Sequence, residues 1–261
     1  MVLVVMQPTY LPWMGYFDLI DQSDVFIFLD TVQFEKQSWQ QRNRIKTPQG
    51  THWLTVPVFH AETQPIIQAR IVQIKSIGSW RRKHWLSLLS NYQKAPFWSE
   101  FGPSFEQLYQ RKHEKLAELN IDLINMLCEA IGIRAKFVRT SELPPLSGKK
   151  AEPLVALCKM FGADVYLSPA GSQAYLESDV LFWKNGTSLL FQQYEHPKYP
   201  QLYGEFIPYL SVVDLMMNAG PKALEIIRSG RRPNKTLSEM PGVSLQVEPE
   251  KTDGLKRITH V

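Results

Sequence analysis

Cysteine is scarce in this sequence, and its scarcity limits the class of protein. The 261 residues include two cysteines, Cys128 and Cys158, and both lie within apolar patterns typical of helices. Two such residues supply neither a disulfide framework nor a zinc pattern. We therefore expect both thiols to be reduced and buried in the core.

Long apolar runs are also absent. The start, MVLVVMQPTY, has no basic region, and its apolar stretch is too short for a signal peptide. No run approaches the roughly 18 apolar residues that a membrane-spanning helix needs. These absences predict a soluble, cytoplasmic protein without membrane insertion.

Several motifs of catalysis and nucleic-acid binding are missing. His52, His60, His113 and His196 are scattered singly, without the paired spacing of metal ligands, so we expect no catalytic metal. The chain has no P-loop and no G-x-S-x-G nucleophile elbow. No array of Lys and Arg with recurring stacking aromatics indicates a DNA-binding channel.

The composition provides for a substantial core and a slight excess of positive charge. Apolar residues make up 44% of the chain, and the formal net charge is +4. Much of this charge is gathered in three clusters, Arg42 to Lys46, Arg81 to Lys83 and Arg228 to Arg232. Such clusters favour an anionic ligand, while solvated surfaces are the commoner explanation for clusters of this kind.

Two short apolar runs near the N-terminus set the predicted fold. Val2–Met6 and Val25–Leu29 are rich in β-branched and aromatic residues and are separated by a segment of helix length. Such runs are typical of buried parallel strands joined by a crossover helix. Polar and aromatic residues follow both runs, which is where open α/β sheets bind their ligands.

Later segments continue the alternation of strands and helices. The patterns predict a β-rich insert over about 47–75, a helical region over about 80–133, a strand at 136–139, a helix at 152–161, and strands at 165–167 and 189–194. These elements predict an α/β fold with a mainly parallel sheet flanked by helices and a nucleotide-binding, Rossmann-like character. We expect one domain over 1–232, followed by a poorly packed tail over 233–261.

The loop after the first predicted strand is a candidate site. Gln7, Tyr10, Gly15 and Tyr16 follow the strand, and Gly15 lets a backbone or a ligand approach the start of the next helix. The N-terminus of a helix attracts phosphate or carboxylate. Two interpretations are open: a loop that contacts a ligand, and an aromatic plug that seals the core.

Asp30 ends the second predicted strand and begins a polar, amide-rich segment. A carboxylate at this position can reach a hydroxyl, an amine or a metal, and it can equally cap a turn. The candidate substrate-binding residues that follow it are Lys36, Trp39, Arg42, Asn43 and Lys46. Arginine offers a planar fork suited to phosphate or carboxylate. If Asp30 and this basic segment converge, they can hold a substrate that carries charges of both signs.

His84 is the candidate general base. It follows Arg81 and Arg82, which are candidates for holding a phosphate. A cationic neighbourhood lowers the proton affinity of an imidazole, which would leave His84 as a neutral base near physiological pH. The alternative is a histidine at the surface or at the edge of the core.

A hydroxyl-rich loop follows the predicted strand at 165–167. Its residues Ser168, Gly171, Ser172 and Tyr175 are further candidates for substrate binding. Their hydroxyls and backbone amides could hold phosphate, although the loop lacks the lysine and the spacing of a P-loop.

Several of these motifs occur together in one known family. They are Gln7-Pro8, Tyr10-Leu11-Pro12-Trp13, Gly15-Tyr16-Phe17, Trp39, Arg42-Asn43, Lys46, Trp80, His84, Tyr166-Leu167-Ser168, Gly171, Tyr175, Leu210-Ser211 and Asp214. In these residues, over about 2–230, the chain resembles the WbqC-like protein family. The resemblance implies a role in the synthesis of bacterial O-antigen or other surface polysaccharides, with transfer of glycine to an amino sugar as the activity.

A more distant similarity concerns the fold. The order of strand, loop with Met14-Gly15, helix and strand, followed by Thr31-Val32-Gln33-Phe34, is similar to pantothenate synthetase and related nucleotide-binding enzymes. Trp13 and Tyr16 stand where the histidines of their phosphate-binding signature would align. The similarity is an analogy of fold.

The preferred hypothesis is a transferase that adds glycine or another small aminoacyl or acyl group to the amine of a nucleotide-linked amino sugar. The partners are that sugar and a donor whose form stays open: free glycine with ATP, glycyl-tRNA, or another thioester or acyl donor. His84 or Asp30 would take the proton of the amine, while basic residues would hold the diphosphate. Two alternatives stay open: an ATP-dependent ligase of the nucleotidylyltransferase-like superfamily, and a noncatalytic ligand-binding or assembly protein. The sequence predicts neither the acceptor sugar nor the oligomeric state.

Overall fold

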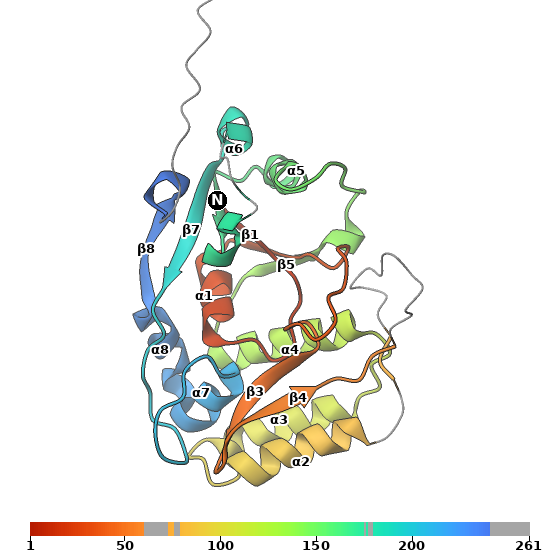
Figure 1. The fold of residues 1–261 in the computed structure, drawn as a ribbon, viewed down its shortest axis with the longest axis vertical. Helices are drawn as coiled ribbons and strands as arrows, with labels where there is room; N and C mark the ends of the chain where they lie inside the picture. The colour runs from red at the N-terminus through yellow and green to blue at the C-terminus, as the bar shows by residue number, and fades with distance from the viewer. Residues whose placement is uncertain (60–72, 76–78, 175, 177–179, 241–261) are drawn as a thin grey trace, which may run out of the picture.

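A six-stranded sheet runs through the centre of the molecule (Figure 1). The structure is a computed structural model that describes residues 1–59, 73–75, 79–174, 176 and 180–240. The strand order is β5-β2-β1-β6-β7-β8. The bounds are β1 (Val2–Met6), β2 (Val25–Phe28), β5 (Lys136–Arg139), β6 (Val165–Ser168), β7 (Ser188–Tyr194) and β8 (Arg231–Thr236). All neighbouring pairs are parallel except β7 and β8, which confirms the predicted α/β fold with a mainly parallel sheet.

The first crossover is the one that the two apolar runs predict. Helix α1 (Met14–Gln22) connects β1 to β2, and the two strands pair in parallel from Leu3 opposite Val25 to Met6 opposite Phe28. Chain order then places β5 beyond β2 and β6 on the other side of β1. The order of the strands therefore reverses between β1 and β6, which is a topological switch point.

Helices cover both faces of the sheet because successive strand residues point to opposite sides. Val4 and Phe26 belong to the core that also contains side chains of α1, α2 (Trp80–Tyr92), α3 (Trp98–Gln110), α4 (Leu116–Ile131), α7 (Val212–Ala219) and α8 (Ala223–Ser229). Leu3 and Ile27 point the other way, into a second core with α5 (Glu152–Phe161) and α6 (Val180–Lys184). Figure 1 shows α5 and α6 at one end of the view and the larger helical layer at the other.

The predicted helical region over about 80–133 consists of three helices. The break between α3 and α4 falls at residues 111–115, where the chain is extended at Arg111. In this segment Lys115 forms a β-bridge with Gln73, and the carbonyl of Glu114 accepts a hydrogen bond from the amide of Ile74. These pairings replace the bonds of a continuous helix.

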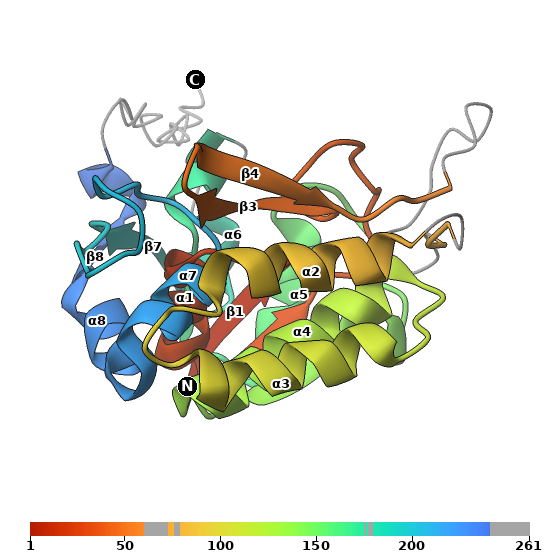
Figure 2. The same ribbon diagram turned by 90° about the horizontal axis from the view of Figure 1, so that it is seen from below.

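A short antiparallel hairpin forms the predicted β insert. Strands β3 (Arg42–Thr47) and β4 (Gly50–Thr55) pair from Arg42 opposite Thr55 to Thr47 opposite Gly50. The hairpin begins upstream of the predicted 47 because the polar stretch 42–47 is itself a strand. Figure 2 shows it lying above α2, and Ile45 and Leu54 join the larger core. The predicted insert extends to about residue 75, and its residues 60–72 lie outside the described part of the chain.

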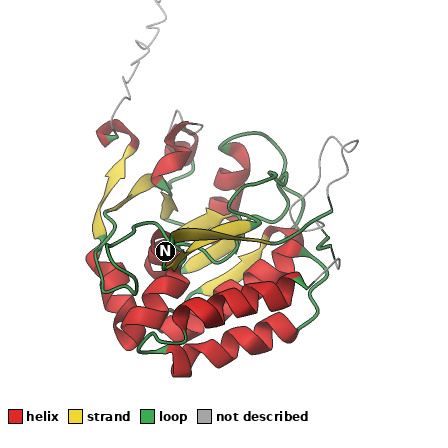
Figure 3. Ribbon diagram, turned by 60° about the horizontal axis from the view of Figure 1, so that its bottom comes forward, coloured by secondary structure: helices red, strands yellow, loops and turns green. Residues whose placement is uncertain are grey.

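Strand β8 extends the sheet beyond residue 232, where we place the end of the domain from sequence. Lys235 and Thr236 pair with Phe191 and Leu190 of β7, and Leu237 is buried in the smaller core. Residues 241–261 of the predicted tail lie outside the described residues. Figure 3 shows β8 as the last strand at one edge of the sheet.

Within the described part of the chain, no helix has both the length and the apolar character needed to cross a bilayer.

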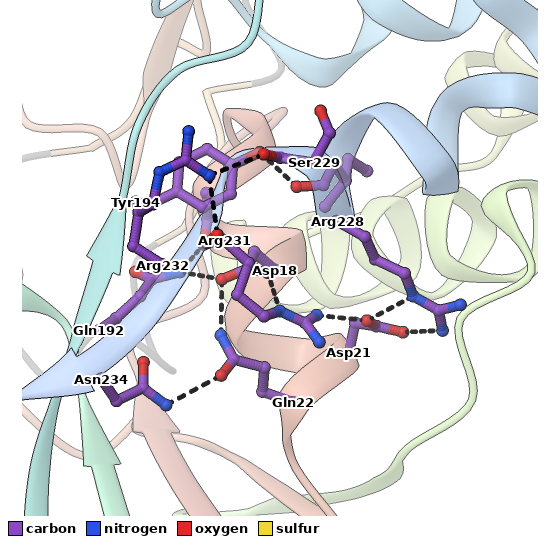
Figure 4. Close-up of polar contacts among 12 residues, drawn as sticks. Asp18, Asp21, Gln22, Gln192, Tyr194, Arg228, Ser229, Arg231, Arg232 and Asn234 are labelled. Carbon is purple, nitrogen blue, oxygen red and sulfur yellow. Dashed lines mark hydrogen bonds and ion pairs between the residues drawn. The ribbon is translucent and has the colours of Figure 1, made fainter.

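An ion-pair network joins the first helix to the last strand (Figure 4). Asp18 of α1 is fully buried, and its carboxylate accepts hydrogen bonds from Arg231 Nε at 2.8 Å and from Gln192 Nε2 at 2.6 Å. Burial of Asp21 favours its neutral form, but hydrogen bonds from Arg228 and Arg231 hold its pKa below the ordinary value. The network therefore fastens the C-terminal elements to the β1–α1–β2 unit.

We expect Arg231→Met to lower the free energy of unfolding by about 3 kcal/mol, because it leaves the buried Asp18 carboxylate without its cation. Arg232→Met is the matched control, since its partner Glu195 is 72% exposed and exposed pairs contribute about 1 kcal/mol or less. Urea denaturation of both variants measures the difference. Equal losses in the two variants would contradict the structural role of the network.

Candidate functional site

A cavity of about 390 Å³ opens at the carboxyl end of β1. It is lined by Met6, Thr9, Pro12, Trp13, Tyr16, Trp39, Asn43, Arg44 and Tyr209. Its residues come from the loop after β1, from α1, from the amide-rich segment and hairpin, and from the loop before α7. Because β1 borders the switch point of the sheet, the cavity lies where open α/β sheets bind ligands.

Backbone and amide hydrogen bonds hold the loop after β1 against the amide-rich segment. The amide of Tyr10 donates to the carbonyl of Trp39 at 2.9 Å. Asn43 Nδ2 donates to the carbonyl of Leu11 at 2.7 Å. The two segments share no helix or strand pairing, and these hydrogen bonds join them into one wall of the cavity.

Two further amides strengthen this connection. Gln40 Nε2 donates to Gln7 Oε1 at 2.7 Å. Asn120 of α4 donates to the carbonyls of Pro8, at 2.9 Å, and of Gln40, at 2.7 Å. Gln7 thus shapes the loop, and its side-chain oxygen is already engaged by Gln40.

Two residues beside the cavity have left-handed backbone conformations. Leu11 has φ of +45° and Tyr209 has φ of +57°. Such conformations cost energy for residues other than glycine and are frequent at ligand sites. Each carbonyl is held by a site residue, since Asn43 bonds to Leu11 and Arg44 NH2 bonds to Tyr209 at 3.2 Å.

Four of the nine described residues that line the cavity are aromatic: Trp13, Tyr16, Trp39 and Tyr209. The ring of Trp13 packs edge-on against Tyr194 and tilted against Tyr209, with centroid distances of 5.5 Å in both pairs. A Cβ at Gly15 would lie 2.3 Å from the Trp13 indole. The close approach that we predict at Gly15 is therefore made by Trp13, and Gly15 does not itself line the cavity.

Arg44 supplies the cationic group of the cavity. One of its terminal nitrogens bonds to the Tyr209 carbonyl, while its Nε is buried and has no hydrogen-bond partner among the described residues. An N–H without a partner is costly inside a protein. The guanidinium can therefore donate hydrogen bonds to an anionic or carbonyl oxygen of a ligand.

The structure does not bring Asp30 to the cavity. Asp30 is 2% exposed, and its carboxylate accepts hydrogen bonds from the Thr140 hydroxyl at 2.9 Å and from the Ser141 amide and hydroxyl at 2.9 and 2.6 Å. These bonds fasten the end of β2 to the residues that follow β5. Asp30 thus acts as a tether between two strand ends.

His84 is enclosed in the core and does not line the cavity either. Its Nδ1 lies 2.8 Å from the Tyr10 hydroxyl, and Trp80 and Tyr109 pack edge-on against its ring. Burial lowers the pKa of His84 to about 4, against the hydrogen bond with the Thr55 backbone, which raises it. The lowered pKa agrees in direction with our prediction, but its main cause is burial and not the neighbouring arginines.

Lys46 lies in a buried polar cluster beneath the hairpin. Its Nζ donates to Gln201 Oε1 at 3.0 Å and to the carbonyl of Glu205 at 2.5 Å. Nearby, Asp214 accepts hydrogen bonds from the hydroxyls of Tyr92 at 2.8 Å and Tyr199 at 2.9 Å. Lys46 is therefore used to hold the loop before α7.

The sequence did not indicate Asp214 as a buried polar residue near the site, because its spacing suggests another role. The i, i+3 spacing of Ser211 and Asp214 predicts a capping box. Ser211 does cap α7, with its hydroxyl accepting from the Val213 amide, but the Asp214 carboxylate turns inward to the two tyrosines. Burial raises the pKa of Asp214, and the hydrogen bonds from both tyrosines and the charge of Lys46 oppose this rise.

The remaining candidates are spread over several places. Arg42 lies over the ring of Trp53 at 4.5 Å, and Lys36 is exposed. Arg81 and Arg82 line a separate cavity of about 310 Å³ between α2 and α3. Of the predicted site residues, those that line the main cavity are Tyr16, Trp39 and Asn43.

The loop after β6 is closed upon itself. The hydroxyls of Ser168 and Ser172 hydrogen-bond to each other, and Ser172 also donates to the Pro169 carbonyl at 2.7 Å. Gly171 is exposed, and Tyr175 lies outside the described residues. Neither serine hydroxyl lines the main cavity.

His196 is the imidazole that packs directly on the cavity walls, and sequence alone did not single it out. Its ring stacks on Trp13 at 6.3 Å and packs edge-on against Tyr209 at 5.0 Å. Nδ1 contacts the Pro197 carbonyl at 2.9 Å, and Nε2 is buried without a partner among the described residues. Burial lowers the pKa of His196.

Among the described residues, no three His, Cys, Asp or Glu side chains are grouped as metal ligands.

These features define an α/β protein with an aromatic cavity at the carboxyl edge of its sheet. The chain belongs to the WbqC-like protein family, whose model matches residues 7–226. It is similar to a Mycobacterium tuberculosis (strain ATCC 25618 / H37Rv) protein described as "Uncharacterized protein Rv1507c", with 33% identity over 230 residues, 87% of this chain and 98% of that protein. No solved structure shows significant similarity.

We expect the stability of the protein to fall as the pH falls from 6.5 to 4, through the titration of His84. The unfolded imidazole gains a proton in this window, whereas the folded one, with its pKa lowered to about 4, does not. The folded state therefore loses up to about 3 kcal/mol from this group. Urea denaturation across this range should show a shallower pH dependence for His84→Gln. Measurements at pH 7.5, where the imidazole is neutral in both states, give the reference, and identical slopes for the two proteins would refute the assignment.

Proposed function

We propose that the protein transfers a glycyl or other small aminoacyl group to the amine of a nucleotide-linked amino sugar. Membership of the WbqC-like family connects the chain with bacterial surface-polysaccharide gene clusters. The observation that carries the proposal is the aromatic cavity with Arg44 in its wall. Aromatic rings pack on the apolar face of a sugar ring, and a guanidinium binds phosphate oxygens in a bidentate manner.

The size and the position of the cavity support a small ligand. Its volume of about 390 Å³ lies within the usual range of small-molecule sites, roughly 300–1,000 Å³. The side chains of Thr9 and Asn43 add polar atoms to the aromatic wall. A few polar groups in a mainly apolar cavity fix the orientation of a ligand.

In the proposed reaction the nitrogen of the amino sugar attacks the carbonyl carbon of the activated aminoacyl group. A C–N bond forms, the bond from that carbon to the leaving oxygen breaks, and the amine loses a proton. Among the described cavity residues there is no carboxylate and no imidazole. The departing oxygen of the donor therefore takes the proton, and the chain contributes by holding the two reactants together.

The same absence of a carboxylate and an imidazole from the described cavity wall favours a second candidate, a noncatalytic binding protein. Such a protein would bind the nucleotide-linked sugar and present it to another enzyme. It needs the aromatic wall and Arg44 but no chemical step.

Mass spectrometry of reaction mixtures separates these functions. The protein is incubated with nucleotide-linked amino sugars and with either glycine plus ATP or glycyl-tRNA. We expect a product heavier by one glycyl residue, and no product from the N-acetylated sugar, whose nitrogen cannot attack. Dependence on ATP would indicate a ligase and dependence on tRNA an aminoacyltransferase. Binding of the sugar without product would support the noncatalytic candidate and refute the transferase.

We expect Arg44→Gln to weaken binding of the nucleotide-linked sugar by about 10- to 100-fold, because it removes charge-assisted hydrogen bonds to phosphate. Arg82→Gln is the control, since this exposed arginine lines the separate cavity. Isothermal titration calorimetry measures both affinities. Unchanged affinity in Arg44→Gln would remove the phosphate role from this residue.

A further inference from the structure

Two exposed tryptophans lie side by side at the cavity, and one of them, Trp39, also lines its wall. Trp39 and Trp53 are 50% and 40% exposed, with ring centroids 5.5 Å apart and ring planes inclined by 35°. Tryptophan is among the most buried residue types on average, so two adjacent indoles at the surface are unusual. Together with two arginines of β3, Arg42 and Arg44, they form what we call the tryptophan platform.

The hairpin brings Arg42, Arg44 and Trp53 together, and Trp39 of the preceding segment packs against Trp53. Arg42 and Arg44 are two residues apart on β3 and therefore point to the same side, while Arg44 pairs with Trp53 across the hairpin. The Arg42 guanidinium lies 4.5 Å from the Trp53 centroid, and the Arg44 guanidinium lies 5.6 Å from it. The opposite face of the hairpin carries Ile45 and Leu54 into the core.

The platform is continuous with the cavity. Trp39 and Arg44 belong to both, since they also line the cavity wall. Arg44 lies 6.0 Å from the Trp39 ring centroid. A ligand that fills the cavity and extends outward past Arg44 must therefore pass over the platform.

We infer that the tryptophan platform binds the nucleobase of the ligand, with Arg42 and Arg44 on its diphosphate and the sugar in the cavity. Indole rings stack on every nucleobase, because each base has a π-face, and arginine matches the oxygens of a phosphate. The inference rests on the proposed function for the identity of the sugar. It adds a recognition site for the nucleotide half, in which Trp53 has a role that does not involve the reacting atoms.

Calorimetry with separated halves of the ligand tests the assignment. The probes are UDP, GDP and dTDP, which lack the sugar, and an amino-sugar 1-phosphate, which lacks the base. We expect the protein to bind at least one of the diphosphates, and Trp53→Leu to weaken that binding by about 5- to 100-fold. Affinity for the sugar phosphate should fall much less than affinity for the diphosphate in Trp53→Leu. Trp183→Leu is the matched control, since Trp183 is 76% exposed on α6, in the opposite helical layer, and circular dichroism checks that both variants are folded.

The outcomes separate this inference from the proposed function. Formation of the glycylated product with full affinity of Trp53→Leu for the diphosphates would overturn the platform and leave the transferase standing. Diphosphate binding that depends on Trp53, without any product, would support the platform and refute the transferase. A short RNA ending in CCA is the remaining probe. If Trp53→Leu weakens binding of this RNA while no diphosphate binds, the platform belongs to the aminoacyl donor and the assignment to the acceptor is wrong.

Discussion

The site depends on the hydrogen bonds that hold the loop after β1 against the amide-rich segment. This loop leaves a buried strand and has no sheet partner for its backbone groups, which must find other partners or remain in contact with water. The carbonyl of Trp39, the amide of Asn43 and the amide of Asn120 supply them. Because these partners keep the loop extended and Leu11 in a left-handed conformation, its aromatic residues form a wall and leave the cavity open.

Much of the fold could be predicted because its signals are local. The apolar runs of β1 and β2, the helix length between them and the carboxyl edge as the ligand side follow from periodicity and from the geometry of parallel sheets. The stretch Arg42–Thr47 carries no such signal, since only Ile45 in it is a large apolar residue. It forms a strand because it pairs with β4 and packs Ile45 on the core beneath the hairpin. Both contacts depend on the fold of the whole chain.

The chemistry of single residues was harder to predict, because it depends on contacts between residues that are distant in the sequence. His84 and Asp30 have the residue types and positions of catalytic groups, but their partners Tyr10 and Thr140 lie 74 and 110 residues away in the sequence. Lys46 is likewise engaged by Glu205, which is 159 residues away. Spacing along the chain reveals that a polar group exists. It does not reveal whether that group already has hydrogen-bond partners within the fold.

The described cavity wall offers shape, aromatic surface and one guanidinium, and it has neither a carboxylate nor an imidazole. A site of this composition lowers a barrier chiefly by orientation and by excluding water, so the donor must bring its own leaving group. An aminoacyl ester or an acyl phosphate meets this requirement, whereas free glycine does not. His196 packs behind Trp13 and Tyr209, and its Nε2 has no hydrogen-bond partner among the described residues.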